Sequence, residues 1–142
     1  MSMQLDKVQP KNKTQLKQLI NYAFKHNIYD LNFIDTSEIT DMSLLFSNRM
    51  HNFDVSSWDV SNVTNMGYIF YHCKNFNCDL SNWDVSKVKN MNYMFYNCKN
   101  FNCDLSDWDI SNITRWKNVF CKRDKMTIPN WYKKLYIVKN KI

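Results

Sequence analysis

The sequence predicts an α/β fold: a short solenoid with a narrow parallel sheet on one side and short helices on the other. The main observation behind this prediction is a phrase that occurs three times, with a tryptophan every 25 residues, at Trp58, Trp83 and Trp108. A strict period of this length is typical of stacked repeats, each of which is one structural unit. The second observation is the spacing of apolar residues inside each repeat, which assigns its strand and its helix.

The first half of each repeat predicts a short strand. Its apolar residues follow the spacing Leu80-x-x-Trp83-x-Val85-x-x-Val88, which matches the L-x-x-L-x-L skeleton of leucine-rich repeats. Trp83 and Val85 alternate with a polar residue, so both side chains should face inward. An earlier, less regular repeat fits the same spacing, at Leu31, Ile34, Thr36 and Ile39.

The second half of each repeat predicts a short helix. After Ser86, apolar residues occur at positions 88, 91, 94, 95 and 98, which is helical spacing. Ser86 should be the N-cap, because its hydroxyl can accept a free backbone N–H. Ser61 and Ser111 hold the same place in the neighbouring repeats.

We expect three parts along the chain: an N-terminal capping helix within residues 1–30, about four repeats of 24–25 residues over 31–121, and a basic C-terminal cap over 122–142. The first cap is an amphipathic helix over residues 14–24. In the second cap, Trp131, Leu135 and Val138 offer an apolar face, and Pro129 would protect an exposed sheet edge because it has no N–H to donate.

The phrases Phe-Asn-Cys-Asp-Leu-Ser-Asn-Trp-Asp-Val-Ser and Met-Asn-Tyr-Met-Phe-Tyr-Asn-Cys resemble the 25-residue repeat of BspA-like leucine-rich repeat surface proteins, and the match covers roughly residues 31–120. The resemblance implies an α/β solenoid and, for secreted members, adhesion to host proteins or other cells. It favours the cell surface, whereas the start of this sequence shows no apolar leader, which favours the cytoplasm. No binding residue follows from the resemblance, because the shared motif is structural.

Charge is distributed unevenly along the chain. The formal net charge is +6, but residues 1–26 carry +4, residues 27–114 carry −6 and residues 115–142 carry +8. A nucleic-acid binder more often places its positive charge on one continuous face, so nucleic-acid binding through the basic ends is only an alternative here. No apolar run approaches the ~20 residues of a membrane span.

One aspartate per repeat falls between the inward strand residues, at Asp35, Asp59, Asp84 and Asp109. We expect this column, with the neighbouring Asn82 and Asp107, to bind a protein partner through a basic segment of that partner. Two alternatives stay open: the aspartates and serines cap the following turn, or the column binds Ca²⁺. A second column, Asp54, Asp79 and Asp104, is expected to cap the turn before the strand.

The cysteines form two matched pairs, Cys73-x4-Cys78 and Cys98-x4-Cys103, with Cys121 left over. Such pairs can bind Zn²⁺, but here each cysteine holds an equivalent repeat position, so we expect free thiols, with zinc or a disulfide as alternatives. The sequence has no glycine-rich phosphate loop and no serine nucleophile motif. We therefore expect a non-enzymatic, adhesin-like interaction module without a cofactor, and leave its oligomeric state open.

Overall fold

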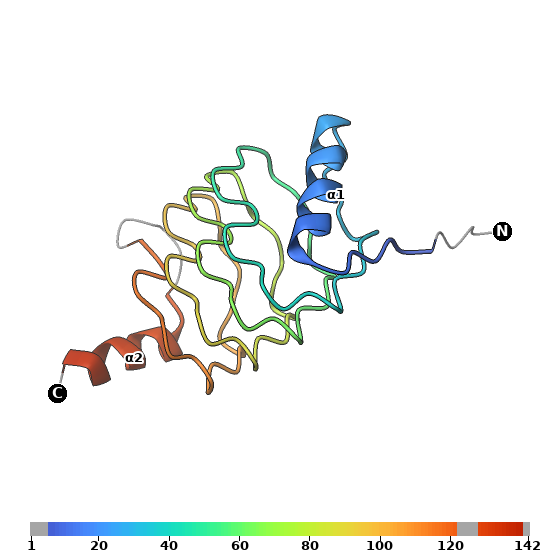
Figure 1. Ribbon diagram of the computed structural model, residues 1–142. Coiled ribbons are helices and arrows are strands. Elements are labelled where there is room, and N and C mark those ends of the chain that lie inside the picture. Colours follow the sequence, from blue (N-terminus) through green and yellow to red (C-terminus); the bar gives the residue numbers. More distant parts are fainter. Residues whose placement is uncertain (1–5, 122–127, 141–142) are drawn as a thin grey trace.

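A computed structural model describes residues 6–121 and 128–140 (Figure 1). Within these residues it contains two helices, α1 (Lys13–Lys25) and α2 (Asn130–Asn140), and no strand. Between the helices the chain winds into successive coils that lie side by side, each about one repeat long (Figure 1).

The predicted fold class is wrong, because the described repeats contain neither the parallel sheet nor the short helices. Isolated parallel bridges join neighbouring repeats, for example between Asn65 and Asn90 and between Asn90 and Arg115, and these bridges lie in the half of the repeat where the helix was expected. Trp83 and Val85 are buried and Asp84 is exposed, as the alternation predicts. Turns on both sides of this segment prevent a continuous ladder, since Trp83 donates its N–H to Leu80 and Val88 donates to Val85.

The predicted helix fails because each repeat contains residues in the left-handed region. Tyr68 and Tyr93 have φ values of 59° and 55°, and His72 and Asn97 have 58° and 64°. A residue with positive φ does not continue a right-handed α-helix. The predicted N-cap role of Ser61, Ser86 and Ser111 is therefore also wrong.

The helical spacing of the apolar residues has another origin, which is a chain of three-residue turns. Met94 donates its N–H to Met91, and Cys98 donates to Phe95, so these inward residues are three positions apart. Between these turn bonds, Tyr93 and Phe95 donate to carbonyls of the next repeat, those of Lys117 and Val119. The turns close each coil, and the bonds between repeats stack the coils.

Aromatic ladders fill the core of the stack. The rings of Phe46, Phe70, Phe95 and Phe120 stack in sequence, with centroid distances of 5.8, 5.5 and 5.5 Å. Each core tryptophan donates its indole N–H to a carbonyl of the preceding repeat, as Trp83 does to Val55 at 3.1 Å. The same bond occurs for the other three, namely Trp58 to Leu31, Trp108 to Leu80 and Trp131 to Leu105.

Helix α1 covers the first coil and confirms the helix predicted over residues 14–24. The Asn12 side chain caps it by accepting the Gln15 N–H at 2.9 Å. Leu16, Ile20 and Ala23 are fully buried in the core. This face closes the stack, which would otherwise expose a whole layer of apolar side chains.

Helix α2 follows the last coil. Trp131 and Leu135 pack against the core, but Val138 is 60% exposed, so the predicted apolar face is shorter than expected. Pro129 has no sheet edge to protect; its carbonyl instead accepts the N–H groups of Tyr132 and Lys133 as the helix starts. Neither α1 nor α2 is long and apolar enough to cross a membrane. Residues 122–127 and 141–142 of the expected C-terminal cap lie outside the described residues.

Candidate interaction surface

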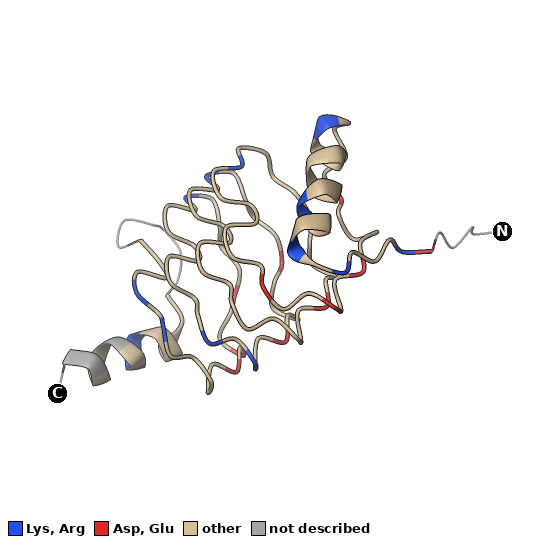
Figure 2. Ribbon diagram, viewed as in Figure 1, with Lys and Arg blue, Asp and Glu red and all other residues tan. Residues whose placement is uncertain are grey.

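Acidic residues of the repeats form a row along the lower edge of the stack in Figure 2, and others lie higher on the same coils. Two aspartates of each complete repeat begin a small turn in which Oδ1 accepts the backbone N–H of the residue two positions later. Asp84, for example, accepts the N–H of Ser86 at 3.0 Å, and Asp79 accepts that of Ser81 at 3.0 Å. The same bond recurs at Asp30, Asp35, Asp54, Asp59, Asp104 and Asp109.

Each complete repeat therefore has two turn-forming aspartates, one on either side of its tryptophan. We define the carboxylate edge as the expected column Asp35, Asp59, Asp84 and Asp109 with Asn82 and Asp107. The second column, Asp54, Asp79 and Asp104, does cap a turn, as predicted. The turn-capping alternative therefore applies to both columns, and it leaves one oxygen of each carboxylate outside the turn bond.

Three of the four aspartates of the column are open to solvent. Asp59, Asp84 and Asp109 are exposed, as are Asn82 and Asp107. Asp35 is half-buried, because its Oδ2 accepts an N–H from Gln9 at 3.1 Å and its backbone N–H bonds to Val8. The N-terminal segment thus covers one end of the column, and the accessible part runs from Asp59 to Asp109.

The turn bonds at Asp84 and Asp109 favour the charged form of these two carboxylates. Hydrogen bonds from Ser86 hold the pKa of Asp84 below its ordinary value, and Lys87 acts in the same direction. Ser111 lowers the pKa of Asp109 in the same way. The nearby charge of Asp109 opposes the shift at Asp84, but it is the smallest of the contributions. Within the described residues, none of these carboxylates forms an ion pair.

Hollows lie beside the second column, and the sequence did not predict them. One, of about 400 Å³, lies between Asp54 and Asp79, and its wall includes Cys78. Another, of about 420 Å³, shares Asp79 with it and continues to Asp104. They are shallow furrows between the turns, whose positions depend on stacking that the sequence pattern alone does not specify.

The cysteines of the described repeats are free thiols. Cys73 is buried and its thiol donates to the Phe46 carbonyl at 2.9 Å. Burial raises the pKa of Cys73 and of Cys78 to about 12. No group of three or more potential metal-binding side chains occurs in the described part of the chain.

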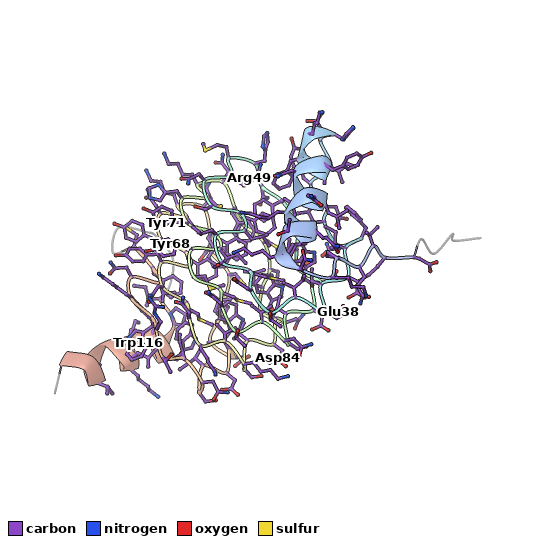
Figure 3. The ribbon with its side chains drawn as sticks, viewed as in Figure 1. Glu38, Arg49, Tyr68, Tyr71, Asp84 and Trp116 are labelled. Atoms are coloured by element: carbon purple, nitrogen blue, oxygen red, sulfur yellow. The ribbon has the colours of Figure 1, made fainter. Side chains whose placement is uncertain are left out.

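Four tyrosines that the sequence marked only as partly exposed form a compact array on another side of the stack. They are Tyr68, Tyr71, Tyr93 and Tyr96, all half-buried. Figure 3 shows Tyr68 and Tyr71 well separated from Asp84 and Glu38. Their equivalence in the repeat was visible in the sequence, but the predicted helices hid that their rings meet.

Comparison with known proteins gives one match. The family described as "Mycoplasma protein of unknown function, DUF285" matches residues 14–131. No curated protein matches the chain, and no solved structure does.

Proposed function

The chain belongs to this family of unknown function, and from that premise we propose that it is a non-enzymatic protein-interaction module whose carboxylate edge binds a basic segment of a protein partner. The observation that carries the proposal is the row of exposed aspartates whose turn bonds leave a charged oxygen on each. Carboxylates of this kind bind Lys and Arg side chains through charge-assisted hydrogen bonds.

The spacing of the row suits an extended segment. Stacked backbones lie about 4.8 Å apart, so the three accessible rows from Asp59 to Asp109 span about 10 Å. An extended chain rises about 3.3 Å per residue, so about four residues reach across these rows. The long Lys and Arg side chains on one face of such a segment would meet the accessible carboxylates.

Two further points support this class of function. The resemblance to BspA-like repeats implies binding to other proteins, as adhesins do. Burial raises the pKa of Cys73 and Cys78, which suits a structural role for these two thiols more than nucleophilic chemistry. Absence of enzymatic activity stays a prediction.

The test replaces Asp59, Asp84 and Asp109 together with Asn. Asparagine preserves the turn, because Asn65 and Asn90 already accept the corresponding N–H groups, those of Gly67 and Asn92. A matched control replaces the second column, Asp54, Asp79 and Asp104, with Asn, which removes the same charge on the other side of the tryptophans. The probe is a fluorescent Lys- and Arg-rich peptide, with an acidic peptide of equal length beside it.

We expect the first variant to bind the basic peptide about tenfold more weakly, because three exposed charge pairs at about 0.5 kcal/mol each amount to about 1.5 kcal/mol. The control variant should lose clearly less affinity. Equal losses in both variants would mean that only the overall charge matters, and unchanged binding in the first variant would refute the proposed surface.

A further inference from the structure

The tyrosine face, defined as Tyr68, Tyr71, Tyr93 and Tyr96, is a two-by-two array of rings. Tyr68 stacks on Tyr93 of the next repeat with centroids 4.9 Å apart, and Tyr71 stacks on Tyr96 at 5.8 Å. Within a repeat the rings meet edge to face, at 5.3 Å for Tyr68 with Tyr71 and 5.5 Å for Tyr93 with Tyr96. Since the ring faces contact one another along the stack, the array offers mainly ring edges and phenol hydroxyls to a partner.

Positive φ at the position of Tyr68 and Tyr93 belongs to the repeat. Leu44, Tyr68, Tyr93 and Asn118 hold this position in successive repeats, with φ values of 62°, 59°, 55° and 48°. The position accepts leucine and asparagine as well as tyrosine, so the backbone itself does not require the two tyrosines.

The surroundings of the tyrosine face are basic. The sequence has no Asp or Glu at positions 60–78, 85–103 or 110–121, the parts of the repeats that form and flank this face. Lys74 and Lys99 follow Tyr71 and Tyr96 by three residues, Lys117 precedes Asn118, and all three lysines are exposed. None of the four phenol hydroxyls forms a hydrogen bond to another described residue. Phenol hydroxyl donors, on coils that here carry lysines and no acidic residue, suit a surface that carries carboxylates.

We propose that the tyrosine face binds the carboxylate edge of a second copy of this chain. Charge complementarity is the first argument, because the two surfaces lie on different sides of the molecule and have opposite character (Figures 2 and 3). The second is periodicity. Both surfaces are built on the same coils, so their rows have the same spacing, and donors on successive repeats of one copy meet carboxylates on successive repeats of another. This proposal rests on the proposed function of the carboxylate edge and names its basic partner.

Such a contact joins two different surfaces, so it is open-ended: each copy keeps one free carboxylate edge or one free tyrosine face for another copy. Wild-type protein should then form chains whose length grows with concentration. Exposed charges are screened by salt over a Debye length of about 10 Å at 0.1 M, so the chains should shorten as salt is added.

The experiment blocks one surface at a time and then mixes the two variants. The tyrosine-face variant carries Tyr68→Asn and Tyr93→Asn, which follow the example of Asn118, together with Tyr71→Ser and Tyr96→Ser, which follow that of Ser47 at the same place in the first repeat. The edge variant carries Asp59→Asn, Asp84→Asn and Asp109→Asn. Tyr22→Ser, which removes a tyrosine that is 60% exposed on α1, is the control.

Sedimentation at low salt should show each blocked variant as a monomer of about 17 kDa and the control as chains like the wild type. An equimolar mixture of the two variants should give a dimer of twice that mass, because each supplies the surface that the other lacks. A monomeric wild type, or a mixture that stays monomeric while both variants are folded, overturns the proposal. The basic-peptide assay separates this proposal from that of the carboxylate edge as a binding surface. If the peptide binds the intact edge and the wild type is monomeric, only the second copy as partner is refuted. If the peptide does not bind and the wild type is monomeric, both proposals are refuted.

Discussion

Replacing Trp83 with Ala tests whether the tryptophan ladder stabilises the stack. The Trp83 side chain is only 4% exposed, and its ring lies 5.9 Å from that of Phe70. Truncating a buried Trp or Phe costs about 3–5 kcal/mol. The Val55 carbonyl would not be orphaned, because it also accepts the Trp58 N–H at 3.1 Å. We therefore expect a loss of about 4 kcal/mol, from the cavity and from one lost bond between repeats.

The assay is urea unfolding followed by near-ultraviolet circular dichroism. Trp83→Phe keeps a ring but removes the indole N–H, so it should cost only about 1–2 kcal/mol. Tyr22→Ala, at an exposed aromatic residue on α1, should change the unfolding free energy by less than about 0.5 kcal/mol. A loss below about 1 kcal/mol for Trp83→Ala would refute the ladder as a main source of stability.

Three further outcomes follow from the described contacts. Burial raises the pKa of Cys73 and Cys78 from 9.0 to about 12, so both thiols should resist alkylation in the folded protein, which mass spectrometry can check. The raised pKa also contributes stability that is present below pH 9 and is lost as the pH rises towards 12. A thermal unfolding midpoint that stays unchanged over that range would contradict this contribution. Turn bonds lower the pKa of aspartates such as Asp84 from 3.8, so their contribution is present above that pH and lost below it, and thermal unfolding should show a midpoint that falls on acidification. A Cβ on Gly67 would lie 2.9 Å from Nδ2 of Asn90, which donates a hydrogen bond to the Asn65 side chain. Gly67→Ala should therefore displace this bond and lower the free energy of unfolding in urea by about 1 kcal/mol. An unchanged free energy of unfolding would show that this amide bond is dispensable.

The period, the buried positions and helix α1 could be predicted from the sequence because they depend on which residues are apolar. Leu80, Trp83 and Val85 are buried as the alternation requires. The secondary structure of the repeats could not be predicted in this way. A chain of turns and an α-helix both place inward residues three or four apart, and only the backbone conformation of residues such as Tyr93 separates the two.

The candidate surface was partly predictable for a similar reason. Aspartates at a fixed place in each repeat must form rows, and the Asp-x-Ser pattern indicates the turn that each aspartate caps. The half-burial of Asp35 was not predictable, because it depends on Gln9, which lies 26 residues earlier. The tyrosine face was missed as an array, since the expected helices would have directed Tyr68 and Tyr71 differently.

The most direct test of the carboxylate edge is a nuclear magnetic resonance titration of the ¹⁵N-labelled protein with the basic peptide. The backbone N–H groups of Ser61, Ser86 and Ser111 donate to Asp59, Asp84 and Asp109, so their shifts report on these carboxylates. If the edge is the binding surface, these three amides shift together and saturate with one affinity, while those of Ser56, Ser81 and Ser106 beside the second column move little. Saturable shifts confined to the second column or to α2, with Ser61, Ser86 and Ser111 unmoved, would contradict it.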